Sequence, residues 1–128
     1  MAEHNELGKI GEEIAKTFLM KQGFSFVEAN YSCHFGEIDL IFRKGEIIHF
    51  IEVKSIKVGS LHVKSKEGID PRDNLTKSKW GKLLRTIEVY SHHKGIKEGN
   101  WRLDLACIYI DMTTRQAKVE MLENVLVE

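Results

Sequence analysis

Two adjacent apolar segments restrict the fold of this chain more than any other feature: EIDLIFR (37–43) and EIIHFIEVK (46–54). Both are rich in β-branched and aromatic residues, and the Lys44-Gly45 pair between them is typical of a tight turn. The pattern therefore predicts a β-hairpin. Each strand nevertheless carries charged residues within its apolar run: Glu37, Asp39, Glu52 and Lys54. Burying an unpaired carboxylate is strongly unfavourable, so the fold must group or neutralise these charges.

The turn decides where the acids of this hairpin lie. With Lys44-Gly45 as a two-residue turn, Glu37 pairs with Glu52, and Asp39 pairs with Phe50. Asp39 and Glu52 are then diagonal neighbours on one face, with Cα atoms about 7–8 Å apart. A shift of the register by one residue would place the acids on opposite faces, so the prediction depends on the turn.

This group of acids has three interpretations. Two neighbouring carboxylates suit Mg²⁺, which binds to one or two carboxylates together with substrate phosphates, and Lys54 could then hold a water or a phosphate oxygen. Alternatively, Glu37 and Glu52 lie at strand ends and pair with Lys54 or Arg102. A carboxylate pair for glycoside hydrolysis is the weakest of the three, because it leaves Lys54 without a role.

The rest of the chain predicts two helices and three further strands. Each helix has an apolar stripe at a period of 3.6 residues and is followed by a glycine. The helices are expected over about 4–22 and 74–93, the strands over 24–31, 103–110 and 117–122, and a long loop over 55–73. The stripes contain Leu7, Ile10, Gly11, Ile14 and Phe18 in the first helix, and Trp80, Leu83, Leu84, Ile87 and Tyr90 in the second. This order predicts one α/β domain over residues 1–128, with helices on both sides of a mixed sheet.

The cysteines and the N-terminus indicate a cytoplasmic protein. Cys33 and Cys107 are far apart and form no C-x-x-C pair, so a disulfide framework or a four-cysteine zinc site is not expected. The N-terminal segment MAEHNELGKIGEEIAK is polar and contains no signal peptide. No segment approaches the length of a membrane span, and we expect no membrane partner.

The net charge is zero, but the charges are unevenly distributed. Residues 54–102 hold twelve Lys or Arg against five Asp or Glu, whereas the remainder holds seven against fourteen. This basic middle could form one positive face for phosphates, or simply a solvated surface. The candidate contacts to nucleic acid are Lys57, Lys64, Lys66, Arg72, Lys77 and Lys79. Lys79 is the first choice, because it lies at the rim of the apolar stripe of its helix, although a lysine that snorkels there fits equally well.

Several ordered motifs resemble a known family. GEIDLI followed by IEVK resembles the D…(D/E)-x-K signature of restriction-endonuclease-like, or PD-(D/E)xK, nucleases. GKIGEEIAKTFLMKQGF is similar to the G-x-x-G-E-x-x-A…L…G start of the bacterial YraN-like family of endonuclease-like proteins. EANY, NLTKSKWGKLL…Y and WRLDLACI follow in that family's order, with Leu103 in place of the usual aromatic residue. The resemblance covers nearly the whole chain.

The resemblance implies a restriction-endonuclease-like fold with three layers, α/β/α, around a central mixed sheet. It implies a Mg²⁺ or Mn²⁺ site formed by Asp39 and Glu52, with Glu12 completing it and Lys54 as the catalytic lysine. Glu37 matches the motif as a supporting residue. The implied activity is hydrolysis of phosphodiester bonds, with DNA favoured over RNA and branched DNA as one candidate substrate. A homodimer is compatible with it, because nucleases for branched DNA are often dimers.

One departure and two alternatives accompany this reading. After IEVK the family continues with an arginine or threonine-arginine, whereas this chain has Ser55-Ile56-Lys57, which bears on substrate contacts more than on the metal. The first alternative is a non-catalytic module of the same fold that binds nucleic acid or a partner in recombination or DNA uptake. The second alternative is a protein-interaction subunit that binds no nucleic acid.

For several other polar and aromatic residues, the sequence predicts structural roles. Asp104 lies in a predicted buried strand beside Arg102, which favours a structural ion pair. The helical spacing of Trp80 favours the core over base stacking. Glu13 is expected on the solvated side of the first helix, opposite to Glu12, which lies beside Ala15 and Leu19.

Overall fold

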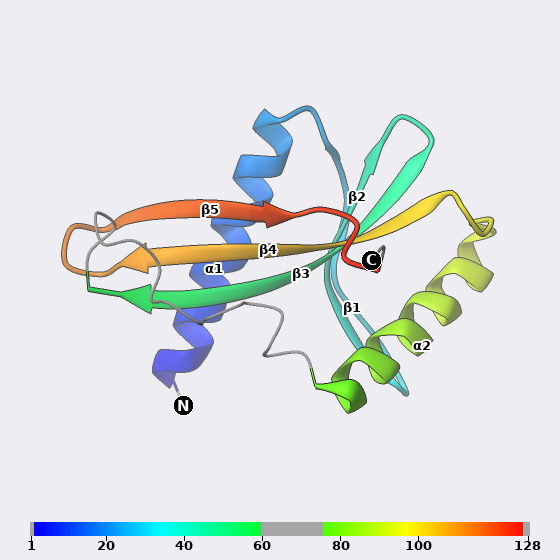
Figure 1. Ribbon diagram of the computed structural model, residues 1–128, viewed down its shortest axis with the longest axis horizontal. Coiled ribbons are helices and arrows are strands. Elements are labelled where there is room, and N and C mark those ends of the chain that lie inside the picture. Colours follow the sequence, from blue (N-terminus) through cyan, green and yellow to red (C-terminus); the bar gives the residue numbers. More distant parts are fainter. Residues whose placement is uncertain (1, 60–75, 127–128) are drawn as a thin grey trace.

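The computed structural model describes residues 2–59 and 76–126, with two helices and five strands in the order predicted (Figure 1). The elements are α1 (Ala2–Lys21), β1 (Ser25–Cys33), β2 (Gly36–Lys44), β3 (Ile47–Val58), α2 (Lys77–Lys94), β4 (Trp101–Asp111) and β5 (Gln116–Leu122). The predicted loop at 55–73 begins later than expected, because β3 continues to Val58. Residues 60–75 of that segment lie outside the described residues, as do Lys64, Lys66 and Arg72.

The five strands form one mixed sheet in the order β1-β2-β3-β4-β5. β3 and β4 run parallel, and the other neighbouring strands are antiparallel. α2 forms the connection that a parallel pair requires, because β4 must start again at the same end of the sheet as β3. The prediction of a mixed sheet between helices is confirmed in this form.

The hairpin register differs from the prediction by two residues. Lys44 pairs with Ile47, so the turn is Gly45-Glu46 rather than Lys44-Gly45. Gly45 adopts a left-handed conformation, with φ of 62°, which a glycine accepts without strain. The predicted pairs of Glu37 with Glu52 and of Asp39 with Phe50 are therefore wrong.

The two faces of the sheet carry separate hydrophobic clusters, each covered by one helix. α1 packs on one face through Ala15 and Leu19, which are fully buried against residues of β2, β3 and β4. Leu7, Ile14 and Phe18 of the predicted stripe pack against this cluster, as expected. The most buried line of α1 runs through Gly11, Ala15 and Leu19, and it leaves Ile10 38% exposed. Small residues on this line let the helix approach the sheet closely.

α2 covers the opposite face of the sheet and is defined by clear caps. Thr76 accepts a hydrogen bond from the backbone N–H of Lys79 at the start, and Gly95 ends the helix in a left-handed conformation. Its buried residues pack against β2, β3 and the start of β4: Leu83, Ile87 and Tyr90. Trp80 is partly buried against this cluster, as predicted. Within the described residues, no helix combines the length and apolar character needed to cross a membrane.

Candidate functional site

The sheet splits into two arms beyond the middle of β2 and β3. Pairing between these strands ends at Leu40 and Ile51. β2 remains paired with β1 as far as Gly36, and β3 remains paired with β4 as far as Val58. The two arms diverge in Figure 1, where β1 and β2 run toward α2 while β3, β4 and β5 lie against α1. Backbone pairing between β2 and β3 thus ends inside the sheet, just before Asp39 and Glu52.

Asp39 and Glu52 are the first residues beyond the last pair, one on each arm. If this register is continued by one residue, Asp39 stands opposite Glu52, whereas the sequence predicted diagonal neighbours. Oδ2 of Asp39 accepts a hydrogen bond from the backbone N–H of Val53 at 2.8 Å. The charge of Asp39 and its side-chain hydrogen bond with Glu52 both raise the pKa of Glu52.

The environment raises the pKa of Glu52 to about 9. The largest cause is burial, followed by the negative charge of Asp39 and the hydrogen bond with it, while Lys79 acts in the opposite direction. Two carboxylates held this close cannot both ionise unless a cation offsets their repulsion. Burial and the neighbouring charge of Asp39 thus favour the protonated form of Glu52.

Glu12 and Glu37 extend the acidic cluster around Asp39. Burial and the charge of Asp39 raise the pKa of both glutamates. With its amide oriented to satisfy both acceptors, Nδ2 of Asn30 donates to Oε1 of Glu12 and to Oε1 of Glu37, at 3.2 Å each. Glu12 thus turns toward the sheet as predicted, whereas Glu13 is exposed.

Asn30 is a site residue that the sequence reasoning missed. It is a non-glycine residue with a left-handed backbone, at φ of 53° in β1. The signal was present, because asparagine tolerates this conformation better than most residues and lies inside the EANY motif. Its role could not be assigned, since it depends on α1 and β2 meeting at the same point.

Lys79 acts on the acidic cluster from α2 through its charge. It lies in the first turn of the helix, and its charge lowers the pKa of Glu52. That first turn contains Lys77 and Lys79 and no acidic residue, although the positive end of a helix dipole favours acids. The start of α2 therefore presents positive charge beside an acidic cluster.

Lys54 lies two residues beyond Glu52 on β3, so both side chains point to the same side of the strand. Its side chain is half-buried. The next residue, Ser55, is covered by α1, because its Oγ lies where a Cβ on Gly11 would be. That Oγ is buried and has no hydrogen-bond partner among the described residues. The close approach of Gly11 places α1, and with it Glu12, against this arm.

The carboxyl groups of the acidic cluster are the candidate metal ligands. Among the residues that the structure describes, no three His, Cys, Asp or Glu side chains are grouped closely enough to hold a metal. Asp39 and Glu52 remain as a pair of neighbouring carboxyl groups, and the charge of Asp39 raises the pKa of both Glu52 and Glu12. A pair of this kind fits Mg²⁺ or Mn²⁺, which keeps waters and takes further oxygens from a substrate phosphate.

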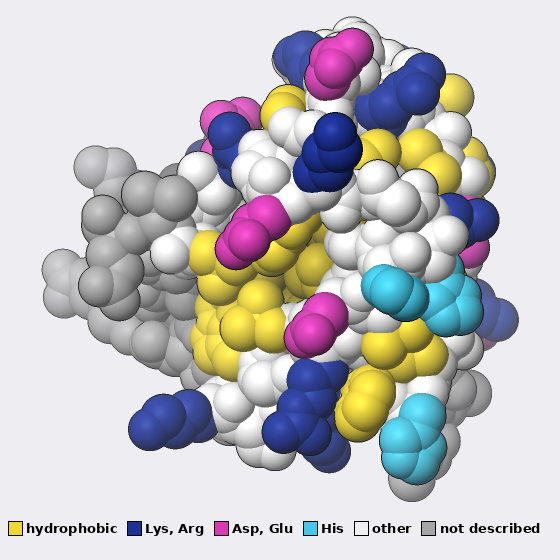
Figure 2. Space-filling view, turned by 90° about the vertical axis from the view of Figure 1, so that its right-hand side faces the viewer, with side chains coloured by type: hydrophobic (Ala, Val, Ile, Leu, Met, Phe, Trp, Pro, Cys, Tyr) yellow, Lys and Arg dark blue, Asp and Glu magenta, His cyan; other side chains and the backbone are white. Residues whose placement is uncertain are grey.

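The described basic residues do not all lie near the acidic cluster. Lys57 is exposed near the end of β3, whereas Lys77 and Lys79 begin α2. On the face shown in Figure 2, Lys and Arg side chains are interspersed with Asp and Glu, and hydrophobic side chains gather in a hollow near its centre. Of the predicted phosphate contacts within the described residues, Lys79 is the one whose charge lowers the pKa of Glu52.

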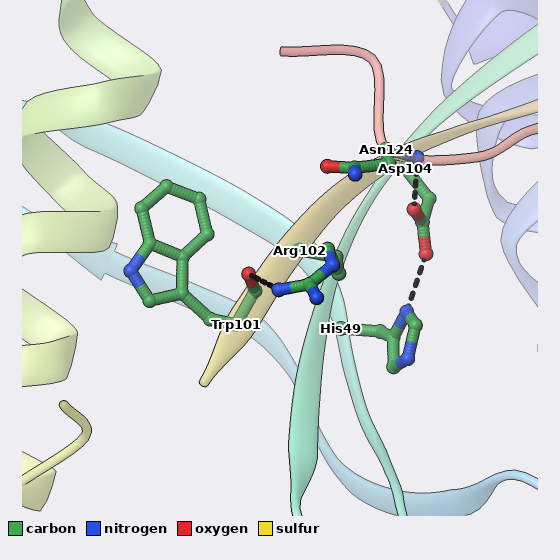
Figure 3. A network of polar contacts seen from close by, with 5 residues as sticks. All are labelled: His49, Trp101, Arg102, Asp104 and Asn124. Atoms are coloured by element: carbon green, nitrogen blue, oxygen red, sulfur yellow. Dashed lines mark hydrogen bonds and ion pairs between the residues drawn. The ribbon is translucent and has the colours of Figure 1, made fainter. Parts of the chain in front are cut away.

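Asp104 has partners other than the one predicted (Figure 3). Its Oδ2 lies 2.7 Å from Nδ1 of His49, and its Oδ1 accepts a hydrogen bond from the backbone N–H of Asn124 at 2.7 Å. Arg102 instead donates to the backbone carbonyls of Gly99 and Trp101. The prediction of an Asp104–Arg102 pair is replaced by a buried network that joins β3, β4 and the C-terminal segment.

Comparison with known proteins places the site within a family. A model of the uncharacterised protein family UPF0102 matches residues 11–108. The chain is 39% identical over 105 residues to a UPF0102 protein of Campylobacter jejuni, covering 82% of this chain and 85% of that protein. It is 32% identical over 125 residues to a UPF0102 protein of Clostridium perfringens, covering 97% of each. The matched span includes every acid of the cluster, and the chain belongs to the UPF0102 family.

Proposed function

We propose that this protein is a metal-dependent nuclease of the restriction-endonuclease-like fold, which hydrolyses phosphodiester bonds in DNA. The main support for this proposal is the pair of Asp39 and Glu52 where β2 and β3 separate, because the pKa of Glu52 is raised there to about 9. A carboxyl group whose pKa is strongly raised by burial and by a neighbouring charge is typical of a functional site. The D…(D/E)-x-K spacing of Asp39, Glu52 and Lys54 supports the same assignment.

Each residue then has a role that follows from its position. Asp39 and Glu52 hold Mg²⁺ or Mn²⁺, with Glu12 nearby, and Asn30 keeps Glu12 and Glu37 in place. The bound cation would polarise a phosphoryl oxygen and lower the pKa of a water molecule. Lys54, on the same side of β3 as Glu52, orients that water or stabilises the charge that develops on the phosphate.

The start of α2 supplies the contact to the nucleic-acid backbone. Free backbone N–H groups and the helix dipole make a helix N-terminus favourable for phosphate. Lys77 and Lys79 add two positive charges there, and the charge of Lys79 lowers the pKa of Glu52. A phosphate between this helix and a cation bound to Asp39 and Glu52 would therefore be attracted from both sides, and its affinity would fall as salt increases.

A cleavage panel tests the proposal. Linear, flap and junction DNAs and a matched RNA are incubated with Mg²⁺ or Mn²⁺ and wild type, Glu52→Gln, Lys54→Ala or the surface control Lys97→Ala. Wild type and Lys97→Ala are expected to cleave at least one DNA, and the two site variants at least about a hundredfold more slowly.

Three outcomes would contradict the proposal. Salt-dependent binding of wild type without cleavage would favour the non-catalytic module of the same fold, and absence of binding to any nucleic acid would favour a protein-interaction subunit. Equal cleavage by wild type and Glu52→Gln would show that the activity resides elsewhere.

A further inference from the structure

β5 forms an open edge of the sheet. Within the described residues it pairs only with β4, and it is the last strand in the sheet order. The opposite edge, β1, is interrupted by a register shift between Phe26 and Glu28 and by the left-handed Asn30. Irregularities of this kind protect an edge from pairing, whereas β5 keeps a continuous register from Gln116 to Leu122.

An apolar groove of about 380 Å³ lies beside this edge, between α1 and the ends of β4 and β5. Its hydrophobic lining comes from three elements and the turn after β4: Ile10, Ile14, Ile110, Met112 and Ala117. Ile10 is 38% exposed and Met112 is 46% exposed. Exposed apolar residues beside an unpaired strand are typical of a surface that another chain covers.

The charges of β5 are arranged symmetrically about Val119. Lys118 and Glu120 flank it, both are exposed, and both point away from the cluster that Val119 contacts under α1. If a second copy of β5 pairs in antiparallel orientation about Val119, Lys118 of each copy lies opposite Glu120 of the other. Opposite charges in directly paired positions favour such a ladder, and the two-fold axis creates the contact twice.

The same register fits the apolar groove. Ala117 would lie opposite Met121 of the second copy, and Ala117 lines the groove on the side of α1. Met121 packs on the α1 side of the sheet, so Met121 of the second copy would face the groove. Glu120 accepts a long hydrogen bond of 3.4 Å from the hydroxyl group of Tyr109, which a pair with Lys118 of the second copy would replace.

We propose that two copies of this chain associate edge to edge through β5, in antiparallel register centred on Val119. The two five-stranded sheets would form one continuous sheet, with Lys118–Glu120 pairs on one face and the apolar groove closed on the other. This interface does not depend on the proposed nuclease activity, because no residue of the acidic cluster takes part in it.

Charge reversal tests both the surface and the register. Sedimentation of wild type at about 1 to 100 µM is expected to show a monomer–dimer equilibrium. Glu120→Lys gives two positive charges and Lys118→Glu two negative charges on β5, so each single variant should dimerise at least about tenfold more weakly. An equimolar mixture of the two variants should restore dimerisation, because every opposed pair is then of opposite sign.

The mixture also excludes misfolding as the cause of weaker dimerisation, because two unfolded variants could not form a specific dimer when they are mixed. Glu98→Lys, an exposed charge reversal after α2, is the matched control and should dimerise like wild type. The proposal is overturned if wild type stays monomeric to about 100 µM. It is also overturned if the single variants dimerise as wild type does, or if their mixture remains monomeric.

Discussion

The backbone N–H of Val53 donates a 2.8 Å hydrogen bond to Oδ2 of Asp39, across the opening between β3 and β2. The carboxylate thus takes the place that a backbone carbonyl would hold in an unbroken ladder. This contact ties the two arms of the sheet together at the point where they separate. Asp39 is consequently both a structural acceptor and the centre of the acidic cluster.

The structural part of this double role can be measured by comparing Asp39→Asn with Asp39→Ala. Both variants remove the charge and its repulsion of Glu52, but only asparagine keeps an acceptor for the N–H of Val53. We expect Asp39→Ala to be less stable than Asp39→Asn by about 1–3 kcal/mol, the penalty of leaving a buried donor unpaired. Urea unfolding at neutral pH gives the difference, and equal stabilities would show that the hydrogen bond is not formed.

The raised pKa of Glu52 predicts how stability depends on pH. The folded protein keeps this proton up to about pH 9, whereas a glutamate in an unfolded chain releases it near 4.5. The stabilisation from this proton is complete below pH 4.5 and is lost as pH rises toward 9. Glu52→Gln should therefore be more stable than wild type by at least about 1 kcal/mol at pH 9 and by less at pH 5.

The exposed Glu98 provides the control for this measurement. Thermal unfolding of wild type, Glu52→Gln and Glu98→Gln is compared from pH 5 to pH 9. Glu98→Gln should follow the wild-type curve throughout. A constant difference between Glu52→Gln and wild type across this range would contradict the assigned pKa.

Divalent cations should reverse this loss of stability. If Mn²⁺ binds to Asp39 and Glu52, it competes with the shared proton and stabilises only the folded chain. We expect the rise in melting temperature on adding Mn²⁺ to grow between pH 6 and pH 8, and to be largely absent in Glu52→Gln. A similar rise in both proteins would indicate binding at another place.

Two glycines of α1 offer a test of how the helix is fixed. A Cβ on Gly11 would overlap the side chain of Ser55, whereas a Cβ on Gly8 would meet nothing within 4 Å. Gly8→Ala should stabilise the protein by about 0.5–1 kcal/mol, because alanine is the better helix former. Gly11→Ala should destabilise it by about 1–3 kcal/mol, because α1 must move away from β3.

Gly11→Ala should also disturb the site, since the displaced helix carries Glu12. The effect of Mn²⁺ on the melting temperature is therefore expected to be weaker in Gly11→Ala than in Gly8→Ala. Stabilisation by both alanines would contradict the close contact between Gly11 and Ser55.

The secondary structure and the location of the site could be predicted because they depend on local patterns. Alternation in 37–43 and 46–54 gave the hairpin, and the motif around Asp39 and Glu52 indicated where chemistry could occur. The face of each acid was correct although the turn was not, because an error of two residues preserves the alternation of side chains. The observed turn at Gly45-Glu46 places Asp39 closer to Glu52 than predicted.

What could not be predicted depends on contacts between distant segments. Asn30 acquires its role only because β1, α1 and β2 meet, and the partner of Asp104 is His49, a residue 55 positions away. Ile10 is left exposed because the most buried line of α1 runs through Gly11, which lies against Ser55. Periodicity places a residue on a helix face but does not determine how closely that helix approaches a sheet.

The central claim is that Asp39 and Glu52 hold a divalent cation together. Anomalous diffraction from crystals soaked in Mn²⁺ tests it directly, with wild type and Glu52→Gln measured under the same conditions. We predict one strong anomalous peak bound by both carboxyl groups in wild type, and its loss or marked weakening in Glu52→Gln. Wild-type crystals with no anomalous peak between Asp39 and Glu52 at millimolar Mn²⁺ would contradict the account.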